Sequence, residues 1–366
     1  MNELLEDKVV EPIMEVLEEV LGGPVNIKDY DANSKSKEYF IEDTEGLKKL
    51  RELVNSGTSF EGKSISVTKE INLQNEEWIP IGTAANPFGG VFDGGDKKIT
   101  NLKIETSSLE YIGLFGYIKK ATIQNVKTEK GSIEGNTSEK NLYAGGLVGC
   151  AEESKFVNCG NTVSIVTLNS IIDARKNETH TGGLVGCVKK SDFTNCSNNG
   201  NITSSSEAQK NLTHKGGTGG IVGSVEEGSF TDCINTGRIE GGWKTEKSIK
   251  DYPSGGIVGK IKNGLLSRCQ NNGTIHITGQ NIGGIAGKSE VDQDKPALFS
   301  ECKNKGEVDV KGRYVGGVIG RGETVDITAC ENQKNIQGES YIGGIIGDLS
   351  KKSSIKESCN KGELKH

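Results

Sequence analysis

Apolar and polar positions along this chain repeat with a period of 27 to 37 residues, and the clearest marker is Gly-Gly-apolar-apolar-Gly. The motif is intact in copies such as residues 145–149 and 255–259, and a degenerate copy at 112–116 precedes them. A period of about 20 to 50 residues is typical of solenoids and repeat arrays. The repeats begin near residues 112, 145, 182, 219, 255, 283, 316 and 343.

Each unit continues with an apolar residue, a cysteine three residues later, an asparagine two residues after the cysteine, and then another apolar residue. This alternation predicts short β-strands with inward apolar side chains. The recurring cysteines are Cys159, Cys196, Cys233, Cys269, Cys302, Cys330 and Cys359. The recurring asparagines are Asn161, Asn198, Asn235, Asn271, Asn304 and Asn332.

The shortest unit, 27 residues, suffices for one coil of a parallel β-helix. In such a solenoid each strand pairs with its counterpart about 4.8 Å away in the next coil, and equivalent side chains stack in ladders. A propeller blade needs four strands in about 40 to 45 residues, and a leucine-rich repeat needs a leucine ladder. The pattern instead predicts an all-β, right-handed parallel β-helix over residues 59–366, with glycine at its corners.

Residues 1–58 differ from the repeats and predict an N-terminal helical cap. A second helix is expected over residues 44–55, with Asp43 or Thr44 as its N-cap. Because the open end of a β-helix exposes unpaired backbone, the helices are expected to form a lid; a partner-docking role is the alternative. The apolar stripe of the first helix consists of Leu5, Val9, Ile13, Val16 and Val20.

The longer units carry up to 10 extra residues relative to the 27-residue unit, always at the same corner. These excursions cover residues 166–181, 203–218 and 240–254, and loops held by a rigid scaffold are common binding sites. Aromatic and polar side chains there suit stacking on a sugar ring and hydrogen bonding to hydroxyls. An alternative is that Trp243 packs against its own loop. The candidate ligand-binding residues are Trp243, Tyr252, His214, Lys215, Asp173 and His180.

The nine cysteines are an odd number, which argues against complete disulfide pairing. The degenerate first copy has Val126 at the cysteine position, so that position is expected to be inward and apolar. Stacked parallel side chains do not favour the torsion of a disulfide, and free buried thiols are predicted, also for Cys150 and Cys187. No close Cys-x-x-Cys or His-Glu-x-x-His occurs, and neither a metal site nor a cofactor is predicted.

Composition and charge exclude several classes of function. Apolar residues make up 33% and glycines number 51, which predicts a thin core with many turns. The net charge is −6 and no basic patch occurs beside aromatic residues, so nucleic-acid binding is not expected. The chain as given shows neither a signal peptide nor an apolar run of about 18 residues, and direct membrane insertion is not expected. Acidic residues are scattered, and catalysis is not predicted.

The chain resembles a known repeat family from residue 39 onward. Residues 60–63 (Phe-Glu-Gly-Lys), 67–73, 78–83 (Trp-Ile-Pro-Ile-Gly-Thr) and 87–94 are similar to the lead-in of bacterial surface proteins with GLUG repeats. The Gly-Gly-Ile-Val-Gly and Cys-x-Asn-x-Gly units resemble the repeats themselves. Such repeats occur in exported adhesins and beside the metallopeptidase unit of some IgA-cleaving proteins. The resemblance implies a parallel β-helix that is extracellular or on the bacterial cell surface.

The expected function is a non-catalytic adhesin or rigid display scaffold that recognises a glycan or a host surface protein. The alternatives are an extracellular polysaccharide-degrading enzyme and a tail-fibre-like module of a phage or injection device. No cap follows the last unit in this chain, which predicts end-to-end contacts through the C-terminal coil. Lysines that would blunt this edge by charge are Lys351, Lys352, Lys356, Lys361 and Lys365.

Overall fold

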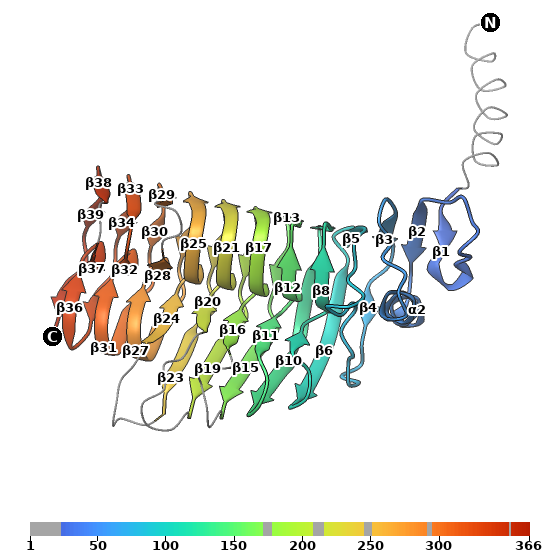
Figure 1. Cartoon of the computed structure of the whole chain (residues 1–366), viewed down its shortest axis with the longest axis horizontal. Coiled ribbons are helices and arrows are strands. Elements are labelled where there is room, and N and C mark those ends of the chain that lie inside the picture. Colours follow the sequence, from blue (N-terminus) through green and yellow to red (C-terminus); the bar gives the residue numbers. More distant parts are fainter. Residues whose placement is uncertain (1–22, 171–177, 208–215, 245–250, 291–294, 351–352) are drawn as a thin grey trace, which may run out of the picture.

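The computed structural model describes residues 23–170, 178–207, 216–244, 251–290, 295–350 and 353–366. It confirms the parallel β-helix: coils stack along the long axis, and the chain advances from one end of the stack to the other (Figure 1). The described strands form two sheets of 17 and 23 strands, and neighbouring coils pair in parallel with equivalent residues opposite each other.

The first sheet holds the strands that follow the glycine motif and those that precede the cysteine. Its strands are β1 (Val25–Asn26), β2 (Glu38–Ile41), β3 (Ser64–Val67), β5 (Val91–Asp93), β8 (Phe115–Lys119), β9 (Thr122–Gln124), β12 (Val148–Glu152), β13 (Lys155–Val157), β17 (Val185–Thr194), β21 (Val222–Thr231), β25 (Val258–Ser267), β28 (Ala286–Glu290), β29 (Ala297–Ser300), β32 (Ile319–Gly322), β33 (Val325–Thr328), β37 (Ile346–Leu349) and β38 (Ser354–Lys356).

The second sheet holds the strands that carry the asparagine and those that lead into the next glycine motif. Its strands are β4 (Ile71–Asn72), β6 (Lys98–Thr106), β7 (Tyr111–Ile112), β10 (Lys127–Thr137), β11 (Leu142–Gly145), β14 (Gly160–Asn161), β15 (Ser164–Asn169), β16 (Thr179–Gly182), β18 (Ser197–Asn198), β19 (Ile202–Ser206), β20 (Gly217–Gly219), β22 (Ile234–Asn235), β23 (Ile239–Trp243), β24 (Asp251–Gly255), β26 (Gln270–Asn271), β27 (Ile275–Gly283), β30 (Lys303–Asn304), β31 (Val308–Gly316), β34 (Glu331–Asn332), β35 (Ile336–Gln337), β36 (Ser340–Gly343), β39 (Cys359–Asn360) and β40 (Leu364–Lys365).

Inside the helix, equivalent apolar side chains stack from coil to coil. The rings of Phe156 and Phe193 lie 4.3 Å apart and nearly parallel, and those of Phe193 and Phe230 lie 4.8 Å apart. Each ring is fully buried, so the ladder removes a large apolar area from water. The repeat period thus converts a short apolar stretch in each unit into one continuous core.

The asparagines form a buried ladder of amide hydrogen bonds. The side chain of Asn198 donates to Asn235 Oδ1 in the next coil at 2.9 Å and to the carbonyl of Gly200 at 2.9 Å. Gly183, the second glycine of its motif, packs against this side chain, and a Cβ there would overlap Asn198. This packing explains why the double glycine and the asparagine recur together.

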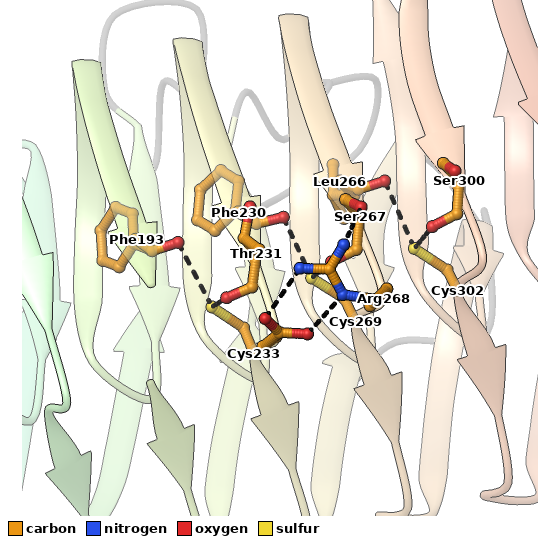
Figure 2. A network of polar contacts seen from close by, with 11 residues as sticks. Phe193, Phe230, Thr231, Cys233, Leu266, Ser267, Arg268, Cys269, Ser300 and Cys302 are labelled. Carbon is orange, nitrogen blue, oxygen red and sulfur yellow. Dashed lines mark hydrogen bonds and ion pairs between the residues drawn. The ribbon is translucent and has the colours of Figure 1, made fainter. Parts of the chain in front are cut away.

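The interior cysteine column matches its prediction along most of its length. Cys159 through Cys330 are free and buried, and Val126 at the equivalent position is also buried. The thiols donate to main-chain carbonyls, for example Cys269 Sγ to the carbonyl of Phe230 at 3.4 Å (Figure 2). Cys359, in the last coil, is exposed and departs from the prediction, because it pairs with Glu331 and Ser358 takes the place opposite Cys330 in the column.

The residue before each buried cysteine of the interior column turns the chain between the two sheets with a positive φ. The value is +54° at Asn195, +55° at Asp232, +51° at Arg268 and +53° at Ala329. Asparagine and aspartate tolerate this left-handed conformation, whereas other non-glycine residues adopt it with strain. The later coils therefore carry a strained corner.

The N-terminal part is only partly as predicted. The expected first helix lies outside the described residues. The second is α2 (Thr44–Asn55), capped by Asp43, whose carboxylate accepts from the Gly46 amide at 2.8 Å. However, a 3₁₀ turn, η1 (Ile27–Asp29), and strands β1 and β2 precede it, and β2 pairs in parallel with β3. The β-structure therefore begins well before residue 59, and α2 lies beside β4 at this end of the stack (Figure 1).

Trp78 joins α2 to the first coils. Its indole NH donates to the carbonyl of Leu114 at 3.0 Å, and the guanidinium of Arg51 lies 5.1 Å from its ring centroid.

At the opposite end of the solenoid, several large apolar side chains of the last coil are exposed. They are Tyr341, Leu349, Ile355 and Leu364.

Candidate binding surface

Of the residues that the sequence grouped into one binding corner, the structure describes Trp243, Tyr252 and His180. Asp173, His214 and Lys215 lie outside the described residues. Trp243 and Tyr252 are 5% and 0% exposed and belong to a second, smaller core formed by β23, β24 and neighbouring strands of the second sheet. Their burial corrects the expectation of a sugar-stacking platform, because neither ring presents a face to solvent.

His180 is part of an aromatic stack at the corner of the glycine motif. Its imidazole lies 5.3 Å from the ring of Tyr143 and parallel to it within 3°. Tyr143 lies 5.1 Å from Tyr111, again nearly parallel, and Tyr117 meets Tyr111 edge-on at 5.2 Å. Strands β7, β11 and β16 place the three stacked rings at equivalent positions of successive coils. Each tyrosine is half-buried, whereas His180 is only 4% exposed, so the tyrosines and not the predicted His180 form the accessible part of the stack.

An apolar pocket of about 320 Å³ lies at the end of this stack. Tyr111 lines it, together with Ile79, Pro80 and Leu109 and with polar atoms of Asn55, Ser108 and Glu110. Ile79 is 55% exposed and Leu109 is 38% exposed, so these apolar groups are accessible to a ligand. A concave, mostly apolar site with a few polar groups is the usual form of a small-molecule or sugar site.

Acidic side chains border the stack. Glu152 accepts from the hydroxyl of Tyr117 at 3.2 Å and pairs with Lys119 at 3.2 Å. Glu178 lies 3.0 Å from Nε2 of His180. Burial raises the pKa of Glu152, but the contacts with Lys119 and Tyr117 outweigh it and hold that pKa below its ordinary value. Glu152 is therefore an anion near neutral pH.

The tyrosine hydroxyls stay protonated in this setting. Burial, followed by the charge of Glu110, raises the pKa of Tyr111 well above its ordinary value. Burial is also the largest cause of the raised pKa values of Tyr117 and Tyr143. The protonated phenols thus stand beside carboxylates, and Tyr117 donates to one of them, Glu152. Hydroxyl and carboxylate groups together suit polyhydroxylated ligands.

A pair of cysteines lies on the strands next to the stack. Cys150 on β12 and Cys187 on β17 occupy the ladder position of Tyr117 in the two following coils. Their sulfur atoms are 2.9 Å apart. Cys150 is 7% exposed and Cys187 is half-buried, so the expectation of buried free thiols holds less well here than in the interior column.

A second depression, of about 660 Å³, lies on the outer face of the second sheet. It is lined by Glu77, Glu105 and Glu134, which come from successive coils. Glu105 and Glu134 are directly opposite in the β6–β10 pairing, and Glu77 accepts from the Glu105 amide at 2.6 Å. Sequence reasoning missed this grouping because the three glutamates follow no common motif.

Comparisons with known proteins support the fold and little beyond it. No family profile matches the chain, so the resemblance to GLUG repeats stays a prediction. A protein of Evansella cellulosilytica named "Putative Gly-rich membrane protein" is 34% identical over 86 residues, which is 23% of this chain and 10% of that protein. The chain thus matches only about a tenth of that relative's length.

A crystal structure from Bacteroides ovatus, described as a "putative immunoglobulin A1 protease", has the same general fold. It aligns with a TM-score of 0.50 over 87% of this chain and 84% of its own, at 15% sequence identity. At that identity the likeness concerns the fold alone. Among the residues that the structure places, no helix has the length and apolar character to cross a bilayer.

Proposed function

We propose that this protein is a non-catalytic β-helix displayed on a bacterial surface, and that it binds carbohydrate in the pocket beside Tyr111. The observation that carries the proposal is the position of Tyr111: one side of its ring is stacked on Tyr143, and the residue also lines an apolar pocket. Aromatic rings with neighbouring polar groups suit sugar rings, which have one apolar face and many hydroxyls.

The surface location has support of its own. The relative in Evansella cellulosilytica bears a membrane-protein name, and rigid solenoids provide the extended surfaces that display proteins use. The sequence resemblance to surface repeat proteins points the same way. A host surface protein remains the alternative ligand to a glycan.

The test is a glycan-array screen followed by calorimetric titration of the best oligosaccharide. Tyr111→Ala is expected to weaken binding about tenfold or more, since loss of about 1.4 kcal/mol of aromatic contact is tenfold in affinity. Ile79→Lys, at a site that is 55% exposed, is expected to block the pocket without disturbing the core. Tyr341→Ala, at the far end of the solenoid, is the matched control. Binding that survives both pocket variants would contradict the proposal.

The acidic depression supports one competing function, cleavage of an extracellular polysaccharide. Glu105 and Glu134 stand opposite each other in adjacent coils, and glycosidases use a pair of carboxyl groups on either side of the scissile bond. Release of reducing ends from a polysaccharide panel, abolished by Glu134→Gln but not by Ile79→Lys, would favour this enzyme over the binding protein.

A further inference from the structure

We propose that Cys150 and Cys187 are a redox site that closes into a disulfide between two neighbouring coils when the protein meets a low-molecular-weight disulfide. The two residues are direct partners in the parallel pairing of β12 and β17. Paired residues of adjacent strands lie about 4.8 Å apart, inside the Cα range of about 4.4 to 6.8 Å that disulfides span. Their sulfur atoms already lie 2.9 Å apart.

The contacts of this pair differ from those of the interior column. Interior thiols donate to main-chain carbonyls, as Cys233 does to Thr231 and Cys302 to Ser300 (Figure 2). The interior thiols also interact with one another from coil to coil, but Cys150 and Cys187 make their hydrogen bond with each other, sulfur to sulfur, at 2.9 Å. A bond between them would therefore replace an existing contact, whereas a bond within the column would remove the thiol hydrogens from their carbonyl acceptors.

Access also distinguishes the two sets. Cys187 is half-buried, while the interior cysteines are fully covered. The neighbouring positions of the same ladder are Tyr117 and Ser224, so the pair has no third thiol beside it in the register. One defined crosslink is the expected product, because the neighbouring positions of this ladder offer no third cysteine with which the disulfide could exchange.

The reaction balances with a small disulfide, RSSR, as oxidant. The accessible Cys187 thiolate attacks RSSR, forms a mixed disulfide and releases one RS⁻. Cys150, losing its proton, then attacks the Cys187 sulfur and expels the second RS⁻. Two cysteine thiols are oxidised, RSSR is reduced to two thiols, and no other reactant is required.

The order of attack follows from the surroundings of the two thiols. The contact with Cys187, followed by burial, raises the pKa of Cys150 well above its ordinary value, so Cys150 is the slower nucleophile near neutral pH. Cys150 therefore resolves the mixed disulfide, and crosslinking is expected to accelerate as the pH rises.

The crosslink would join the coils that carry Tyr143 and His180, because β11 and β16 lead directly into β12 and β17. Oxidation would thus fix the spacing of the aromatic stack. The site does not depend on the proposed carbohydrate binding, and its test uses no sugar.

The experiment incubates the native full chain with oxidised glutathione and counts free thiols after denaturation. The exposed Cys359 is expected to take up one glutathione and the crosslink to consume two further thiols, so the count is expected to fall from nine to six. A peptide containing Cys150 linked to one containing Cys187 is expected by mass spectrometry. Oxidation is also expected to raise the melting temperature. Eight or nine remaining thiols, or a crosslink that involves the interior column, would overturn the proposal.

Two single variants test the mechanism. Serine is already present at this ladder position as Ser224, so Cys150→Ser and Cys187→Ser are expected to fold. Cys150→Ser should accumulate a glutathione adduct on Cys187, and its absence would contradict the order of attack. Cys187→Ser should lose only the Cys359 thiol. Cys233→Val, in the interior column, is the matched control and should still lose three.

Discussion

Removing one rung of the asparagine ladder tests how the coils are held together. Asn198 makes four hydrogen bonds: it donates to Gly200 and Asn235 at 2.9 Å each, and it accepts from Asn161 at 3.0 Å and from the Gly200 amide at 3.2 Å. Asn198 is 0% exposed, so water does not replace the hydrogen bonds that its partners lose when the side chain is removed. At about 1 kcal/mol for each bond, Asn198→Ala is expected to cost about 4 kcal/mol.

The matched control is Asn199→Ala, one residue further on. Asn199 is exposed and accepts one hydrogen bond, from the hydroxyl of Thr236 at 2.7 Å. Its replacement is expected to change stability by about 0.5 kcal/mol or less.

Both variants are measured by urea unfolding, with hydrogen exchange to localise the effect. Solenoids unfold by coils as well as globally, so protection should fall most in β18 and in the strands paired with it, β14 and β22. If the stabilities of Asn198→Ala and Asn199→Ala lie within about 1 kcal/mol of each other, the asparagine ladder contributes little to the stability of the fold.

Three further predictions concern single positions. Cys233→Val is expected to cost about 1.5 kcal/mol or less in urea unfolding, whereas Cys233→Asp should unfold its coil by burying a charge. Ala329→Gly should stabilise by about 1 kcal/mol, since it relieves the positive φ of that corner; an unchanged urea midpoint would refute this. Burial raises the pKa of Glu290, but the contacts with Lys260 and Lys288 outweigh burial and hold that pKa below its ordinary value. The lowered pKa therefore stabilises the folded protein at neutral pH. This contribution is lost as the pH falls, first through the pKa of Glu290 in the unfolded chain and then through its lower pKa in the folded protein. Glu290→Gln should flatten that part of the curve of melting temperature against pH.

The fold was predictable because the residues that stack in ladders recur in the sequence with the period of one coil. Each copy carries its glycines, cysteine and asparagine at nearly the same offsets, and Val126 in the first copy already indicates an inward position. The start of the β-structure was not predictable in this way. Strands β1 and β2 lack the glycine motif, and only their pairing with β3 reveals them.

The binding surface was harder to predict, although part of its signal was present. Tyr111, Tyr143 and His180 each lie two residues before the first glycine of their unit, so repeats aligned on that glycine place them in one ladder. Trp243 was expected on a loop, yet it lies four residues after buried Ile239 and therefore on the same face of a strand. The apolar pocket depends on loops from different coils meeting, and no pattern in a single unit encodes that.

The asparagine ladder also gives the solenoid aligned side-chain dipoles along its axis. In every rung the amide NH points toward the C-terminal coil and the carbonyl oxygen toward the N-terminal one, and main-chain contacts such as those of Gly200 prevent the amide from turning over. The aligned dipoles add and polarise one another, as they do along an α-helix. Thr128 closes the negative end by donating its hydroxyl to Asn161 at 2.9 Å. A grafted or swapped coil must therefore enter in the same sense as its neighbours, because a reversed amide would set donor against donor on one side and acceptor against acceptor on the other.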